Sequence, residues 1–133
     1  MPASSIPALL TQPGTTIAVV GATDTPGKYG GIVYRDLKSK GYRVLPVNPT
    51  RDTVDGDPAF PSVVHLPETP TIVNIAVPPD AALDVLASCR DAGYTNVWLQ
   101  PGAESPDVEE FLDANGFDYL VNACIMIQTR TTG

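Results

Sequence analysis

Residues 16–30, with the sequence TIAVVGATDTPGKYG, constrain what this chain can fold into more than any other stretch. Residues 16–20, which are apolar from Ile17 to Val20, predict a buried strand that stops at Gly21. A loop of small and turn-forming residues follows, and the segment after it predicts a helix. A loop and helix N-terminus that follow a strand offer backbone N–H groups and a favourable dipole to an anion. The stretch therefore favours a phosphate-holding loop over an ordinary strand-to-helix turn.

Three glycines in this stretch have separate expected roles. Gly21 would let a ligand approach the backbone, and Gly27 and Gly30 would let the helix pack closely on the strand. Their spacing does not match the dinucleotide fingerprint G-x-G-x-x-G, because Ala22 and Thr23 follow Gly21. The glycines therefore favour a phosphate loop without specifying a dinucleotide.

The end of the next predicted strand, 43–47, also bears on the ligand. In NAD-binding domains an Asp or Glu near this strand end commonly binds the ribose hydroxyls. Here Asn48 and Pro49 follow Val47. The lack of an acidic residue at this strand end counts against NAD. NADP remains open, because the guanidinium of Arg51 could receive a 2′-phosphate.

Predicted strands and helices alternate along the chain. Further strands are expected over 71–77, 95–100 and 117–121, and helices over 27–40, 80–92 and 106–115. Residues 50–70 are rich in proline and predict a shortened crossover, with at most a short strand or turn at 61–65. Residues 6–10 predict one helical turn. We predict an α/β fold of the Rossmann-like, doubly wound type, with a mainly parallel sheet of five to six strands and helices on both faces.

Five loops would meet at the carboxyl edge of such a sheet, where ligands of these folds bind. They are the segments 21–30, 46–51, 77–80, 100–103 and 122–124. None of them contains two carboxylates, a Ser/His pair or a metal-binding cluster. His65, the one histidine, has no neighbouring nucleophile or second acid in the sequence. We therefore expect no catalytic residue and no metal site, and an edge that holds a ligand without transforming it.

The charge distribution supports an anionic small molecule. The net charge of −7 argues against nucleic acid, but six basic residues and one acid give residues 28–51 a charge of +5. Lys28 and Arg51 lie nearest to the predicted ligand. For Arg35, Lys38 and Lys40, a solvated helix face explains the charge equally well.

The class of protein follows from length and composition. The 133 residues suffice for one domain, and no apolar run approaches the roughly 18 residues of a membrane span. No secretory signal is evident, and Cys89 and Cys124 lack C-x-x-C partners. We expect a cytoplasmic protein with two reduced thiols and no membrane partner.

Five motifs occur in a characteristic order: VVGATDTPGKYG, PVNPTRD, VPP, WLQPGA and NACIMI. Together they resemble the stand-alone CoA-binding domain proteins, which are similar to the CoA-binding domain of succinyl-CoA synthetase α subunits and of ADP-forming acyl-CoA synthetases. The resemblance covers residues 15–127. It leaves 1–14 as an N-terminal extension and 128–133 as a frayed tail.

The resemblance implies coenzyme A, free or acylated, as the cofactor, and it assigns residues to each part of that molecule. The pyrophosphate would lie on the backbone of the first loop, beneath the K-Y-G motif. The adenosine would lie at the second strand end, Val77 and Pro78 would line the nucleotide cleft, and the pantetheine would run along residues 100–103. The cofactor-binding residues are then Gly21, Ala22, Thr23, Lys28, Tyr29, Gly30, Val47, Asn48, Pro49, Arg51, Val77, Pro78, Gln100, Gly102, Ala103 and Asn122.

Two of these positions depart from the family pattern. Thr50 and Arg51 stand where Lys commonly follows P-V-N-P, and Asn122 and Ala123 precede the last cysteine where the family often has a charged residue.

Three functions fit these observations. The first is non-catalytic binding of coenzyme A or an acyl-CoA. The second is an NAD(P)-dependent enzyme or redox sensor on the same fold. The third is a CoA-holding subunit of a separate acyl-CoA synthetase-type enzyme. The expected partners are a small-molecule nucleotide ligand and either a partner enzyme or a second copy of the chain. Cys124 would serve as a mixed-disulfide partner for the CoA thiol or as a buried, inert residue.

Overall fold

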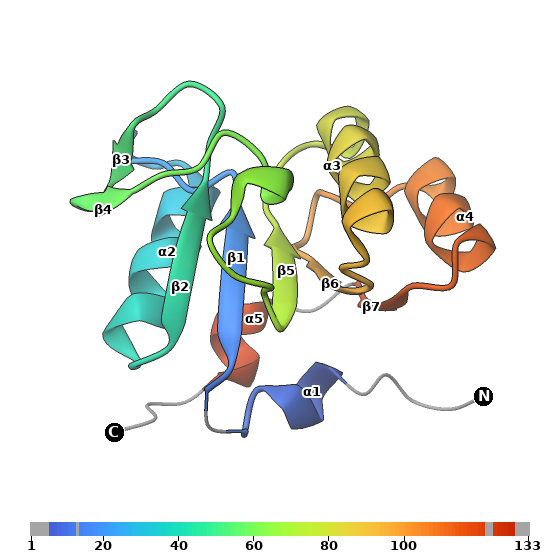
Figure 1. Ribbon diagram of the computed structural model, residues 1–133, viewed down its shortest axis with the longest axis horizontal. Coiled ribbons are helices and arrows are strands. Elements are labelled where there is room, and N and C mark those ends of the chain that lie inside the picture. Colours follow the sequence, from blue (N-terminus) through green and yellow to red (C-terminus); the bar gives the residue numbers. More distant parts are fainter. Residues whose placement is uncertain (1–5, 13, 122–123, 130–133) are drawn as a thin grey trace.

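A five-stranded parallel sheet forms the centre of the protein in a computed structural model that describes residues 6–12, 14–121 and 124–129 (Figure 1). The strand order is β2-β1-β5-β6-β7, and every neighbouring pair is parallel. The strands are β1 (Thr16–Val20), β2 (Arg43–Val47), β5 (Ile72–Ile75), β6 (Asn96–Leu99) and β7 (Asp118–Leu120). The predicted Rossmann-like α/β fold is confirmed.

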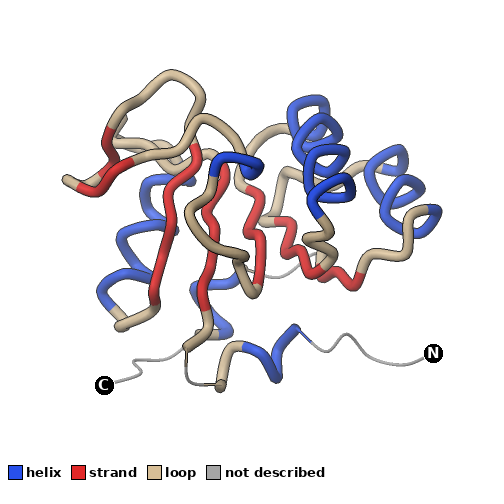
Figure 2. The backbone as a smooth tube through the Cα atoms, viewed as in Figure 1, coloured by secondary structure: helices blue, strands red, loops and turns tan. Residues whose placement is uncertain are grey.

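Helices cover both faces of this sheet, because successive side chains of a strand point to opposite faces. Ile17 and Val19 pack with α1 (Ile6–Leu9), α2 (Tyr29–Ser39) and α5 (Ile125–Gln128). Ala18 and Val20 pack on the other face with α3 (Pro79–Ala92) and α4 (Pro106–Ala114). Figure 2 shows the strands enclosed between these two groups of helices. Both faces are apolar, as a parallel sheet requires.

The crossover from β2 to β5 is short, as predicted. It consists of a small hairpin, β3 (Thr53–Val54) with β4 (Asp57–Pro58), and a 3₁₀ turn, η1 (Val63–His65). This hairpin was not predicted. Its turn residues Asp55 and Gly56 both have positive φ, 51° and 79°, and an Asp-Gly pair is a strong hairpin signal.

The described ends of the chain pack against the domain. The predicted helical turn forms as α1, where Ile6 and Leu10 are buried. At the other end we expected a frayed tail from residue 128, but Gln128 ends α5 and Thr129 is buried. Lys40 Nζ donates to Met126 O at 2.6 Å and fixes this segment. Among the described helices, none is long and apolar enough to cross a membrane.

Candidate functional site

The loop between β1 and α2 brings the helix N-terminus close to the strand end. Gly21 has φ +95°, and a Cβ there would lie 2.7 Å from the carbonyl oxygen of Ala76, the residue that follows β5. A Cβ at Gly30 would approach Gly21 O, and one at Gly31 would approach Thr23 O, both closer than 3.0 Å. The expected close packing at Gly30 is thus present. At Gly27 it is absent, because nothing lies within 4 Å, and Gly31 performs that role.

The backbone N–H groups of the first turn of α2 lie next to this loop. Lys28 is the N-cap, in an extended conformation, and its side chain makes no capping hydrogen bond. The first N–H groups of a helix lack intrahelical partners. The first turn contains no acidic residue that would compete with an anion. The segment 21–31 therefore has the features of an anion-binding loop.

Residues after β2 hold the loop in shape. Gly21 N–H donates to Val47 O at 3.0 Å, and Asn48 Nδ2 donates to Ala22 O, also at 3.0 Å. Arg51 Nε donates to Thr23 Oγ1 at 3.1 Å. Thus six predicted site residues from the two strand ends lie together, and hydrogen bonds within the protein hold the loop in shape.

The basic residues of segment 28–51 divide into two groups. Lys38 pairs with Asp55 and Asp57, at 3.1 and 2.8 Å. Lys40 pairs with Asp36, and Arg43 pairs with Glu68. Within the described residues, the other three, Lys28, Arg35 and Arg51, form no carboxylate ion pair. Carboxylate partners therefore account for Lys38, Lys40 and Arg43, whereas Lys28, Arg35 and Arg51 remain as cations near segment 21–31, and Arg51 contacts Thr23 of that segment directly.

A buried polar network lies at the ends of β5 and β6. Gln100 is 1% exposed, and its Oε1 accepts from Asn74 Nδ2 at 3.1 Å and from Ile125 N–H at 2.9 Å. Its Nε2 donates to Cys124 Sγ at 3.4 Å. Protein partners therefore occupy the amide of Gln100, which joins the strand ends to α5 rather than facing outward.

Tyr29 extends this network to the phosphate-type loop. Its hydroxyl lies 2.8 Å from Cys124 Sγ, although the side chain is 41% exposed. The hydrogen bond to Cys124, followed by partial burial, raises the pKa of the Tyr29 phenol. Cys89, by contrast, lies in the core, where burial raises the pKa of its thiol to about 12. Cys89 is thus the inert thiol of the two, and Cys124 lies at the site edge.

The remaining predicted residues line the edge with fewer mutual contacts. Val77 packs near Gly21, and Pro78 is the N-cap of α3. Gly102 N–H donates to Glu104 Oε2 at 3.1 Å, and Ala103 is buried beside the β6 end. Asn122 lies outside the described residues.

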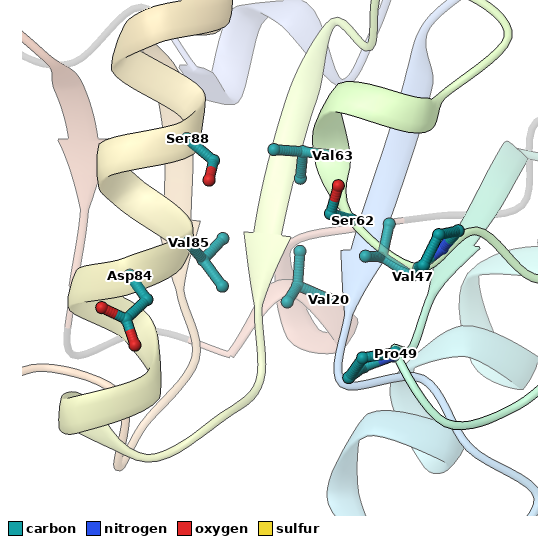
Figure 3. Close-up of a pocket in the computed structure, with 9 residues that line it drawn as sticks. Val20, Val47, Pro49, Ser62, Val63, Asp84, Val85 and Ser88 are labelled. Atoms are coloured by element: carbon teal, nitrogen blue, oxygen red, sulfur yellow. The ribbon is translucent and has the colours of Figure 1, made fainter.

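A pocket of about 200 Å³ opens at the ends of β1 and β2, between η1 and α3 (Figure 3). Its apolar walls include Val47 and Pro49, the two residues that we expected beside the adenosine. The sequence analysis missed the rest of its lining: Val20, Pro61, Ser62, Val63, Asp84, Val85 and Ser88. The shortened crossover could have predicted this pocket, because a crossover without an α-helix leaves this part of the sheet uncovered.

No group of three His, Cys, Asp or Glu side chains is placed to hold a metal ion within the part of the chain described. His65 is exposed, and its Nδ1 lies 2.8 Å from Ser62 Oγ, so the expectation that His65 has no neighbouring nucleophile is wrong.

Comparison with known protein families shows the family of this chain. The family described as CoA binding domain matches residues 15–130. The chain belongs to this family. The CoA-binding domain thus covers the sheet, all five strand ends and the loop at 21–31.

Relatives of this CoA-binding domain include both small and large proteins. The uncharacterized protein YneT of Bacillus subtilis is 26% identical over 91% of this chain and 90% of its own length. The ADP-forming acetate–CoA ligase II of Archaeoglobus fulgidus is 34% identical over 71% of this chain, but this chain spans 14% of the ligase. A solved conserved hypothetical protein from Pyrococcus furiosus is 43% identical, with a TM-score of 0.84 over 86% of this chain and 99% of its own.

Proposed function

We propose that this domain binds coenzyme A, free or acylated, at the carboxyl edge of its sheet and catalyses no reaction by itself. The observation that carries the proposal is the braced loop at 21–31, which adjoins an apolar pocket in a chain of the CoA-binding domain family. A loop whose shape is fixed beforehand loses little conformational entropy when it receives a phosphate group.

The ligand would lie along the edge in a defined order. Its pyrophosphate would accept hydrogen bonds from the backbone of residues 21–23 and the first turn of α2. Lys28 and Arg51 would supply positive charge, and Arg51 is already held at the loop by Thr23. The adenosine would lie by Val47 and Pro49, Val77 and Pro78 would line the nucleotide cleft, and the pantetheine would run along residues 100–103 after β6.

The absence of catalysis is part of the proposal. The edge is lined by backbone groups, apolar residues and amides, and its one partly exposed thiol contacts a tyrosine and a glutamine. We assign no general base, nucleophile or metal there. Incubation with an acyl-CoA should therefore return the acyl-CoA unchanged, as monitored by chromatography.

Thermal unfolding with CoA, acetyl-CoA, NAD and NADP in parallel tests the binding class. A ligand present at 100 times its dissociation constant stabilises the folded state by about 2.7 kcal/mol. For a domain of this size, that corresponds to roughly 5–15 °C in Tm. We expect a shift with CoA species alone. A shift with NADP and none with CoA would replace this proposal by the NADP enzyme or redox sensor.

A second candidate function follows from the ligase relatives. Because this chain spans only 14% of the A. fulgidus ligase, it could hold CoA for a separate chain that carries the catalytic parts of an acyl-CoA synthetase. Affinity capture with the CoA-loaded protein tests this candidate. Recovery of a chain that completes ADP-forming ligase activity on recombination would support it, and reconstitution of no such activity with any captured chain would exclude it.

A further inference from the structure

The hairpin of β3 and β4 is fastened to α2 by polar and charged contacts. The hydroxyl of Tyr34, a fully buried residue, donates to Asp57 Oδ2 at 2.6 Å, and Lys38 Nζ lies 2.8 Å from the same oxygen. Lys38 Nζ also donates to Asp55, to Oδ2 at 3.1 Å and to the backbone oxygen at 3.3 Å. Val54 of the hairpin is buried in the same apolar cluster as Tyr34. The hairpin is therefore packed onto α2 as a fixed part of the domain.

One side chain of the loop 21–31 contacts this hairpin. Asp24 Oδ1 accepts a hydrogen bond from the backbone N–H of Asp55 at 2.8 Å, although the two residues are 31 positions apart in the sequence. Figure 1 shows the β1–α2 loop beside the hairpin. Asp55 has φ +51° and is itself held by Lys38, so the turn presents its N–H in a fixed position. The carboxylate of Asp24 is therefore directed to the hairpin turn by a defined partner.

The segment that leads into this hairpin contains Arg51, the cation that contacts the loop. Arg51 Nε donates to Thr23 Oγ1 at 3.1 Å, and β3 begins two residues after Arg51, at Thr53. The loop and the hairpin segment are thus joined at two adjacent loop residues, by Thr23 to Arg51 and by Asp24 to Asp55. Loss of the second hydrogen bond would let the segment that carries Arg51 move relative to the loop backbone.

We propose that Asp24 is a positioning residue: it ties the loop 21–31 to the hairpin, so that the loop backbone and Arg51 converge on the same phosphate group of the ligand. The inference rests on the proposed function and adds to it a residue that does not touch the ligand. By its charge alone, Asp24 repels a bound phosphate, because both groups are anionic. By its hydrogen bond it holds Arg51 in place before the ligand arrives, and preorganisation of this kind strengthens binding. The assignment therefore predicts that removal of this negative charge weakens the binding of an anion.

Isothermal titration calorimetry with CoA and ADP tests this assignment in three variants. Asp24→Ala removes both the charge and the acceptor, whereas Asp24→Asn removes the charge and keeps an acceptor oxygen. Asp52→Ala is the matched control, because Asp52 is an exposed acid beside Arg51 whose side chain makes no hydrogen bond or ion pair within the described residues. We expect Asp24→Ala to weaken both ligands about three- to tenfold. Asp24→Asn and the control should bind both ligands at least as tightly as the wild type.

A double-mutant cycle with Arg51→Ala tests whether Asp24 acts through Arg51. Because Asp24 is exposed, we expect its replacement to leave the protein folded. If Asp24 acts by holding Arg51, Asp24→Ala should lose most of its effect in the Arg51→Ala background, since residues that act as one unit are not additive. A general loosening of the fold would instead weaken binding by the same factor in both backgrounds. Additive losses would therefore overturn the positioning role.

The outcomes separate this inference from the proposed function. If the wild type binds CoA and Asp24→Ala binds it as tightly or more tightly, charge repulsion dominates and the positioning role is overturned, while CoA binding stands. An Asp24→Asn variant as weak as Asp24→Ala would overturn the hydrogen-bond assignment in the same way. If the wild type binds ADP but not CoA, and the variants keep the expected order, the positioning role stands and the CoA assignment fails. If the wild type binds neither ligand, both proposals are overturned.

Discussion

Replacement of Gly30 by Ala tests whether the close approach of α2 to β1 creates the anion site. A Cβ at residue 30 would meet Gly21 O, a backbone atom, at less than 3.0 Å, so α2 and the β1 end must move apart. Overpacking of this kind typically costs about 1–3 kcal/mol. The same displacement moves the first-turn N–H groups of α2 away from the loop backbone, so the two sets of donors no longer converge on one phosphate group.

The assay combines thermal unfolding with calorimetric titration of CoA. We expect Gly30→Ala to lower Tm by roughly 2–15 °C and to weaken CoA binding at least tenfold. Gly27→Ala is the matched control in the same loop. Its Cβ would meet nothing within 4 Å, and it tests only the cost of an alanine at φ +79°, about 1–2 kcal/mol. The control should lose stability but retain most of its affinity in the folded state. Wild-type affinity and Tm in Gly30→Ala would refute the argument.

Three further predictions concern charges. Arg51→Ala should weaken CoA binding about ten- to hundredfold in calorimetric titration, since a charge-assisted hydrogen bond is worth about 1.5–3 kcal/mol. Arg43→Ala is the control and should leave the affinity unchanged, because Arg43 pairs with Glu68. Lys28→Glu should weaken CoA binding most at low salt, and a salt-independent affinity equal to the wild type would contradict its placement at the phosphates. Hydrogen bonds from Lys38 and, second, from Tyr34 lower the pKa of Asp57 below its ordinary value of 3.8. The ionised Asp57 therefore stabilises the folded state above pH 3.8, and this contribution is lost as the pH falls through the lowered pKa. Asp57→Asn should therefore flatten the acid side of the stability–pH curve measured by urea unfolding, and an unchanged acid slope would refute this contribution.

The parts of the fold that the sequence predicted well have local causes. The bounds of β1 and β2 were predicted to the residue, because a run of apolar residues ends at Gly21 in one case and at Asn48-Pro49 in the other. The helix α2 follows from its apolar spacing. Its predicted range was longer by two residues at the start, where the extended N-cap at Lys28 closes the loop.

The parts that the sequence did not predict depend on contacts between distant segments. The role of Gly31 in close packing exists only because the carbonyl of Thr23 turns toward α2. The burial of Gln100 follows from partners on β5 and α5, and the four-residue helix α5 is too short to leave a periodic pattern. Similarly, Asp84 lines the pocket only because η1 lies opposite α3, and η1 is distant from α3 in the sequence.

The central claim is that CoA binds at the carboxyl edge of the sheet, and NMR titration of the ¹⁵N-labelled protein tests it most directly. Addition of CoA should shift the amide resonances of residues 21–23 and 28–31 and of residues near the pocket on α3. The opposite edge supplies an internal control, because a separate pocket lined by Thr69–Thr71 and Gly93–Asn96 lies among the strand starts. Resonances there should stay in place. Shifts confined to that amino edge, or none at millimolar CoA, would contradict the account.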